Sequence, residues 1–462
     1  MKNQCVEPEE LVKLSEGINP YLVGNFAPVH EEVALENLPV HGLIPLELSG
    51  RLLRIGPNPV TAPDPSSYHW FIGNGMVHGI EIKDGRALAY RNRYVVDRQV
   101  AQALGKPELG GPARSEDFPV NTNVLRINGR TYALVEAGGL PIELDRNLNS
   151  IARSDFDGTL AGGFTAHPHL DPETGDYHAI AYQAGNPILH YIVVDKAGAA
   201  RVVSEISAPH MPMVHDIAIT KSHLVFLDLP VHFSIELAQH GQFPFAWKEG
   251  AQSRIGLLPR SGEVEKLQWF AAPTCYVFHV MNAYERGTDE VVVDVVKHSK
   301  TFAKHLDGPR EGKINLVRWI INRSTGSVSE TELCNRGLEF PRINENYTGR
   351  DYQYGYTAMF AGGLRLGSVQ KHDVRNGSTE VHDFGRGQMA GEPVFIPASR
   401  SSNVANSNAE DCGWAMTCVY NEATETSSIH ILDAQNFAGE AVAIIDLLVR
   451  VPFGFHGNWL PD

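Results

Sequence analysis

Residues 276–285 read YVFHVMNAYE, and residues 290–296 read EVVVDVV. Both runs are rich in β-branched and aromatic residues, and their lengths are typical of strands. Similar runs recur along the chain: TYALVEA (131–137), ILHYIVVD (188–195), HLVFLDL (223–229), INLVRWII (314–321), CGWAMTCVY (412–420), SSIHILDA (427–434) and AVAIIDLL (441–448). Helical patterns are few, so the sequence predicts an all-β fold.

Turn-forming pairs separate these runs. They include Asp84-Gly85, Asn128-Gly129, Ser261-Gly262 and Asn376-Gly377. Several of the gaps between such pairs are about 45–65 residues, which suits one four-stranded sheet with its connections. A β-propeller or a large barrel is therefore expected. No interdomain linker is evident, so residues 1–462 are predicted to form one domain.

Two short helices are expected outside the sheets. The segment EPEELVKLSEG suggests that residues 1–20 form a helical N-terminal extension, and DRQVAQALGK predicts a helix within 97–106. Neither is long enough to change the predicted fold class.

Charge and cysteine content restrict the function and the compartment. The chain has 39 basic and 54 acidic residues, a net charge of −15. Such a surface disfavours nucleic acid and electrostatic docking to anionic lipid, but leaves hydrophobic contact with a membrane open. The five cysteines are irregularly spaced, and neither a signal peptide nor a long apolar run is visible, so a cytoplasmic location is expected. No obligate protein partner is implied.

Four of the 20 histidines lie in or beside apolar, strand-like runs. They are His167 in FTAHPHL, His215 in MVHDIAIT, His279 in YVFHVMNAYE and His456 in GFHGNW. Each taken singly is explained by a hydrogen-bonded core position. Their spacings exclude a local metal motif, but a propeller would bring its inner strands to one axis. Four neutral imidazoles there would suit zinc, copper, iron or nickel.

Three glutamates also occupy apolar contexts: Glu136 in YALVEAGG, Glu339 in GLEFPRIN and Glu392 in GEPVFIP. A buried carboxylate needs a partner, and a metal-bound imidazole usually donates its second N–H to one. An ion pair offers another explanation, since Arg342 lies close to Glu339 in sequence.

Together these segments resemble the carotenoid cleavage oxygenase family, and the resemblance runs nearly end to end. NPYLVGNFAPVHEE (19–32), LLRIGPNP (52–59) and HWFIGNGMVHG (69–79) resemble its amino-terminal signatures, whereas LEFPRIN (338–344) and GEPVFIP (391–397) resemble its late blades. The resemblance implies a seven-bladed β-propeller, with a few short helices and loops forming a cap over the metal face.

The same resemblance implies a site. One Fe(II) per chain would be held by His167, His215, His279 and His456, with His169 the nearest competitor to His167. Glu136, Glu339 and Glu392 would orient three of the four imidazoles, although the pairing is not readable from sequence. No further catalytic residue is implied, and the substrate-binding residues remain unassigned.

The implied reaction is oxidative cleavage of a C=C bond by O2, giving two carbonyl products. The substrate would be a lipophilic carotenoid or apocarotenoid held in an apolar tunnel. Stilbene-cleaving relatives carry a lysine directly before the first glutamate, where this chain has Val135, and an upstream tyrosine that has no match at Val100 or Ala101. A stilbene or phenylpropene substrate is the alternative.

Two other functions are also compatible with the sequence. A retinoid-type isomerase would use the same iron scaffold without consuming oxygen. A propeller that serves as a binding platform would make the four histidines structural. A serine hydrolase is disfavoured, because the chain contains no G-x-S-x-G segment.

Overall fold

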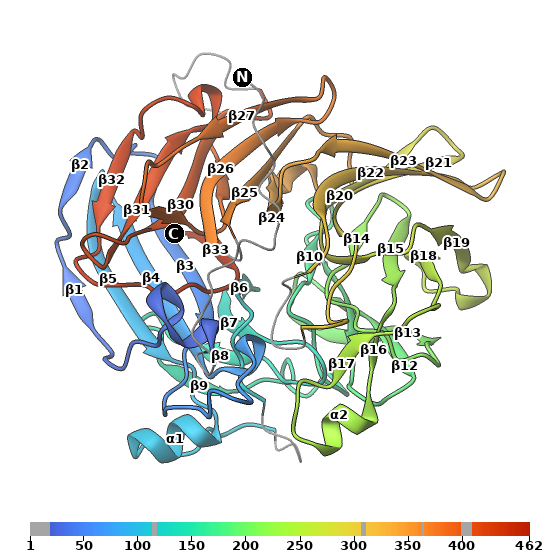
Figure 1. Cartoon of the computed structure of the whole chain (residues 1–462), viewed down its shortest axis with the longest axis horizontal. Coiled ribbons are helices and arrows are strands. Elements are labelled where there is room, and N and C mark those ends of the chain that lie inside the picture. Colours follow the sequence, from blue (N-terminus) through green and yellow to red (C-terminus); the bar gives the residue numbers. More distant parts are fainter. Residues whose placement is uncertain (1–18, 113–117, 306–310, 363–364, 399–408) are drawn as a thin grey trace.

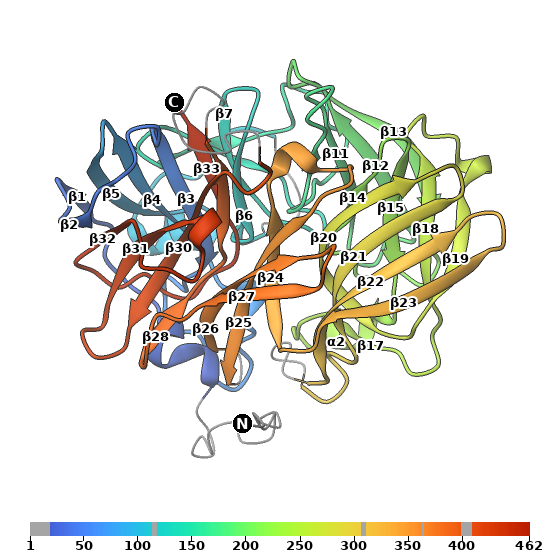
Figure 2. The ribbon, with the colours of Figure 1, turned by 90° about the horizontal axis from the view of Figure 1, so that it is seen from above.

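The computed structural model describes residues 19–112, 118–305, 311–362, 365–398 and 409–462. Seven sheets are arranged around a central axis, with a two-stranded ribbon beside them (Figure 1). The predicted seven-bladed β-propeller is therefore confirmed. In both views the first and seventh sheets lie side by side, with the fourth and fifth at the opposite end of the ring (Figure 2).

The first sheet contains strands from both ends of the chain, whereas the second and third are built from consecutive strands. The first comprises β1 (Ala34–Glu36), β5 (Arg86–Tyr94), β4 (Gly75–Lys83), β3 (Gly50–Pro57) and β33 (Gly457–Pro461) in spatial order. The second contains β6 (Asn123–Ile127), β7 (Arg130–Leu134), β8 (Ile142–Leu144) and β9 (Ser150–Arg153). The third contains β10 (His169–Leu170), β11 (Tyr177–Tyr182), β12 (Ile188–Val194) and β13 (Ala200–Ser207).

The next three sheets are built from consecutive segments, apart from one excursion. The fourth contains β14 (Ala218–Ile219), β15 (His223–Asp228), β18 (Ser253–Pro259) and β19 (Gln268–Ala272), and the ribbon of β16 (Val231–Phe233) and β17 (Phe245–Trp247) interrupts it. The fifth contains β20 (Tyr276–Arg286), β21 (Glu290–His298), β22 (Ile314–Asn322) and β23 (Ser327–Cys334). The sixth contains β24 (Leu338–Ile343), β25 (Tyr354–Gly362), β26 (Arg365–Asp373) and β27 (Ser378–His382).

The seventh sheet closes the ring. It contains β2 (Val40–Gly42), β32 (Ala443–Asp446), β31 (Thr426–Asp433), β30 (Gly413–Asn421), β28 (Gln388–Ala390) and β29 (Val394–Pro397). The early strand β2 pairs with β32, while the last strand β33 pairs with β3 and lies near the centre beside β6 (Figure 1). Backbone hydrogen bonds at both ends of the chain therefore hold the ring closed.

The turn residues act as the sequence predicted at two hairpins. Asp84-Gly85 joins β4 to β5, and Asn128-Gly129 joins β6 to β7, with positive φ at all four residues. Such a pair matches the right-handed twist of the flanking strands, because both central residues of a type I′ turn need positive φ. These turns fix the register that brings inner strands to the axis.

The helix predicted within 97–106 is confirmed as α1 (Arg98–Leu104). Asp97 caps it by accepting a hydrogen bond from the Val100 N–H, and Gly105 ends it in the left-handed conformation at φ 61°. A second short helix, α2 (Ile235–Gln239), lies between β16 and β17. The helix predicted in residues 1–20 falls on residues 1–18, outside the described residues. Within the described ranges, no helix has the length and apolarity needed to cross a bilayer.

Several buried histidines away from the axis couple stability to pH. Burial lowers the pKa of His78 and His178 to about 3 and that of His372 to about 4. These histidines take up protons near pH 6.5 in the unfolded chain but remain neutral in the folded chain. Their contribution to the free energy of unfolding is therefore complete above that pH and is lost progressively toward pH 4.

We therefore expect the free energy of unfolding to fall as the pH drops from about 7.5 to about 5, by up to about 1.4 kcal/mol per pH unit for each such histidine. Urea unfolding of the metal-free protein at several pH values would measure it. Replacing His372 with glutamine should make the slope shallower. A free energy that is constant or rises over this range would contradict the assignment.

Candidate metal centre

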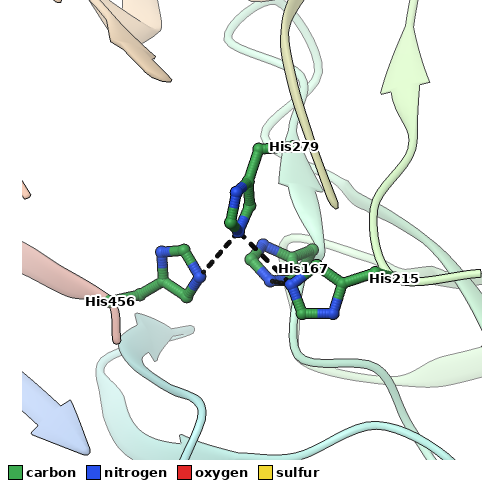
Figure 3. Close-up of side chains that lie close together, drawn as sticks. All are labelled: His167, His215, His279 and His456. Carbon is green, nitrogen blue, oxygen red and sulfur yellow. Dashed lines mark hydrogen bonds between the residues drawn. The ribbon is translucent and has the colours of Figure 1, made fainter. Parts of the chain in front are cut away.

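The four predicted histidines come together on the propeller axis. His167 and His215 lie just before β10 and β14, His279 lies within β20, and His456 directly precedes β33. One nitrogen from each ring lies within 4.8 Å of the other three, and Figure 3 shows the rings converging on a common centre. Four different blades thus supply one imidazole each.

Neighbouring imidazole rings approach one another through their Nε2 atoms. The Nε2–Nε2 distances are 3.1 Å between His167 and His215, 3.3 Å between His215 and His279, and 3.1 Å between His279 and His456. Three of these four rings belong to buried residues, and His167 is partly buried.

The three predicted glutamates occupy the remaining three blades. Each accepts the Nδ1–H of one histidine: Glu136 from His215 at 2.9 Å, Glu339 from His279 at 2.6 Å, and Glu392 from His456 at 2.9 Å. This fixes the pairing that the sequence left open. Every blade therefore contributes one histidine or one glutamate to the axis.

The hydrogen bonds show what the centre can hold. A carboxylate only accepts, so the proton of His215, His279 and His456 is on Nδ1 and their Nε2 lone pairs face inward. Unprotonated nitrogens that face one another at 3.1–3.3 Å repel unless a cation lies among them. Four imidazole nitrogens suit a first-row transition metal, so the donor set fits such an ion.

The charges around the centre keep Glu339 and Glu392 ionised and His167 neutral. Burial alone would raise the pKa of Glu392, but Arg342 and His456 together hold it at about 2. Burial also opposes ionisation of Glu339, yet its histidine partners keep its pKa well below the ordinary value. Burial, reinforced by the nearby imidazoles, keeps the pKa of His167 far below its usual range, so its ring is neutral.

The position of Arg342 in the sequence suggested an ion pair with Glu339, but its guanidinium pairs with Glu392 instead. Its Nη1 lies 3.2 Å from Glu392 and donates to the Gly457 carbonyl at 2.9 Å. Arg342 lies on β24 of the sixth blade, and its guanidinium reaches across to Glu392 of the neighbouring seventh blade. Arg342 thus stabilises the carboxylate that orients His456.

His169, the competitor to His167, has a different partner. Its Nε2 donates to the buried Asp216 carboxylate at 2.7 Å. The other oxygen of Asp216 accepts the Val280 N–H at 2.8 Å, beside His279. Asp216 therefore ties together the three segments that carry His167, His215 and His279, a role that no sequence pattern indicated.

An apolar cavity opens onto the centre. Its aromatic lining includes Phe26, Trp70, Phe71, Phe243, Phe278 and Phe455. Val135 also lines this cavity, whereas Val100 and Ala101 lie on the buried side of α1 in one cluster with Met76 and Tyr94. The comparison with stilbene-cleaving relatives therefore rests on Val135.

Phe340 also lines the cavity and lies in a strained position. It follows Glu339 with φ 56°, a left-handed conformation that is unusual for an aromatic residue. Its ring centroid lies 5.4 Å from those of both His279 and His456. The strain places an aromatic face against two of the imidazoles, and nothing in the sequence pattern indicated it.

Comparison with known proteins identifies the class. A family model described as "Retinal pigment epithelial membrane protein" matches residues 26–461. A carotenoid cleavage oxygenase of Mycobacterium tuberculosis is 38% identical over 502 residues, covering 97% of this chain and 98% of that protein. The chain belongs to the carotenoid cleavage oxygenase family, and its relatives are named as oxygenases and dioxygenases, which are oxidoreductases.

Two solved structures show the same architecture. A lignostilbene dioxygenase of Pseudomonas brassicacearum is 27% identical with a TM-score of 0.86, covering 96% of this chain and 98% of that one. A cobalt-substituted apocarotenoid oxygenase of Synechocystis is 26% identical with a TM-score of 0.84, covering 94% of this chain and 97% of that one. The family fold therefore extends over nearly the whole chain.

Proposed function

We propose that this protein is a non-haem Fe(II) dioxygenase that cleaves a C=C bond of a carotenoid or apocarotenoid. One alkene and one O2 would give two carbonyl products, with no further co-substrate. The observation that carries the proposal is the set of inward-facing imidazole nitrogens at the end of an apolar, aromatic cavity. The names of its relatives support the same chemistry.

His167, His215, His279 and His456 would hold the iron. When bound, iron would supply a site for activating O2 beside the alkene. Glu136, Glu339 and Glu392 keep three ligands in one tautomer and orientation, and their negative charges offset the charge of the ion.

The cavity walls would position the substrate. A long polyene gains from apolar contact along its length, and positioning errors of about 1 Å can be costly. Phe278 and Phe340 present aromatic faces next to the imidazoles, where they would stabilise positive charge developing on the polyene. The same residues exclude water from the reacting bond.

The choice between a polyene and a phenolic substrate depends on the side chain that lines the cavity beside Glu136. Val135 offers no charge to a phenolic hydroxyl, which favours a carotenoid or apocarotenoid. The likeness to a lignostilbene dioxygenase keeps a stilbene as the second candidate. The buried Tyr182 hydroxyl lines the cavity and is a polar group that a phenol could meet.

We further propose that the whole propeller acts as one catalytic domain, because all seven blades contribute to the axial site. The four described cysteines are free thiols, which supports a reducing, cytoplasmic location. Ile72 lines the cavity and is 44% exposed, which supports hydrophobic contact of the cavity mouth with a membrane that delivers a lipophilic substrate.

A substrate panel tests the proposal. Iron-loaded protein is incubated with β-apo-8′-carotenal or resveratrol while oxygen uptake is recorded and products are identified by mass spectrometry. We expect two carbonyl products from the apocarotenal, one O2 consumed per alkene, and no reaction with the His279→Ala variant. Cleavage of resveratrol alone would overturn the substrate assignment. Isomerisation of the substrate without oxygen uptake would overturn the proposal of oxidative cleavage.

A further inference from the structure

The structure places an unassigned histidine behind one of the metal-orienting glutamates. His298 is the last residue of β21 and is 1% exposed. Its Nε2 lies 2.7 Å from Oε1 of Glu339. The other oxygen of that carboxylate accepts the Nδ1–H of His279 at 2.6 Å and the Phe340 N–H at 2.7 Å. Glu339 is therefore shared between two histidines.

The geometry explains how these groups meet. His298 and His279 belong to neighbouring strands of the fifth blade, and β21 pairs with β20 through Tyr276 and His298. Glu339 enters from β24 of the sixth blade. One carboxylate thus links two blades, and each of its oxygens is held by a different histidine.

The hydrogen bonding fixes the form of His298. Glu339 can only accept, so Nε2 of His298 carries the proton. Its Nδ1 is buried and has no hydrogen-bond partner within the described part of the chain. The ring packs edge-to-face on Phe278, with centroids 5.0 Å apart, beside His279. The side chain is therefore locked by one hydrogen bond and one aromatic contact.

We propose that His298 is a positioning residue for the metal centre. It holds one oxygen of Glu339 so that the other keeps His279 in the Nδ1–H tautomer, with Nε2 directed at the metal. Without His298, one buried carboxylate oxygen would lose its donor, and Glu339 would be held only through its other oxygen, by His279 and the Phe340 N–H. This role rests on the proposed metal-binding function of the four histidines.

The test measures metal binding rather than activity. Metal-free protein is titrated with Co(II) against a competing chelator, and the visible cobalt spectrum is recorded. Wild-type protein should bind about one Co(II). His298→Phe keeps the aromatic packing and removes the hydrogen bond, so its Kd should rise by about 10-fold, the lower end for loss of a group that orients a ligand. The cobalt spectrum should shift as well.

Two comparisons separate positioning from a general structural effect. His298→Gln restores a donor and should return the Kd to within about threefold of wild type, whereas His372→Phe alters a buried histidine bonded to Thr357 and Thr379 and should leave it unchanged. In a Glu339→Gln background, His298→Phe should add little, because both changes act through one carboxylate. If His298→Phe does not fold, His298→Leu makes the same deletion with a smaller side chain.

The outcomes are distinguishable. Wild-type affinity and an unchanged cobalt spectrum in His298→Phe would overturn the role of His298 while leaving the metal centre intact. Additive losses of Co(II) affinity in the variant that combines Glu339→Gln and His298→Phe would also overturn the role of His298. Absence of Co(II) binding by the wild-type protein would instead overturn the proposed function on which this inference rests.

Discussion

Deleting residues 456–462 should abolish metal binding and strongly destabilise the protein, although 455 residues remain. The deletion removes His456 and the whole of β33, whose ladder with β3 closes the first blade. It also removes Leu460, which is 2% exposed, and truncating one such side chain alone costs about 2–5 kcal/mol. Metal titration and urea unfolding of the metal-free form would measure the two effects.

The substitution His456→Ala separates these effects. It removes one imidazole and keeps β33, so the ring should stay closed while metal affinity falls by more than about 100-fold, since even a group that only orients a ligand contributes about 10–100-fold. A truncated protein that retained wild-type metal affinity would show that His456 is not a ligand. A truncated protein as stable as the full chain would show that β33 does not hold the ring closed.

The substitution Glu392→Gln should weaken metal binding by about 10–100-fold. The carboxylate orients His456 and accepts the Gly457 N–H at 2.7 Å. It also faces Arg342, and a neutral amide would leave that buried guanidinium without its buried counter-charge. Competition titration with Fe(II) under anaerobic conditions would give the Kd, and the free energy of unfolding should fall as well.

Glu345→Gln is the matched control for this variant. Glu345 contacts Arg342 at 3.0 Å but is 53% exposed in its side chain and does not touch a histidine. Its loss should change the metal affinity by less than about twofold, because an exposed ion pair contributes little. Equal losses in both variants would mean that Arg342, and not the orientation of His456, governs the metal affinity.

The sequence was most informative where local context was unusual. His279 and His456 lie in aromatic, strand-like runs, where an imidazole needs specific partners, and that context indicated both residues. The tail that carries His456 continues into β33, which pairs with β3 and lies beside β6 near the axis. Phe453 and Phe455 are buried in an aromatic cluster with Tyr21 and Trp70 and also line the cavity.

Contacts between blades could not be predicted from the sequence. Glu392 and His456 are 64 residues apart, and their contact depends on the closure of the ring. The sequence left open an ion pair between Arg342 and Glu339, but Arg342 contacts Glu392 of the neighbouring blade, which proximity in sequence does not indicate. Asp216, next to His215, acts through the neighbouring blade, so no local pattern showed its contacts with His169 and Val280.

Metal analysis of the purified protein, reconstituted with Fe(II) and then desalted, tests the central claim most directly. The inward-facing nitrogens of His167, His215, His279 and His456 predict about one iron per chain in the wild type and loss of that iron in His279→Ala, with little change in fold. A wild-type protein that holds no iron, with His279→Ala equally stable, would contradict the account and leave the propeller a binding platform.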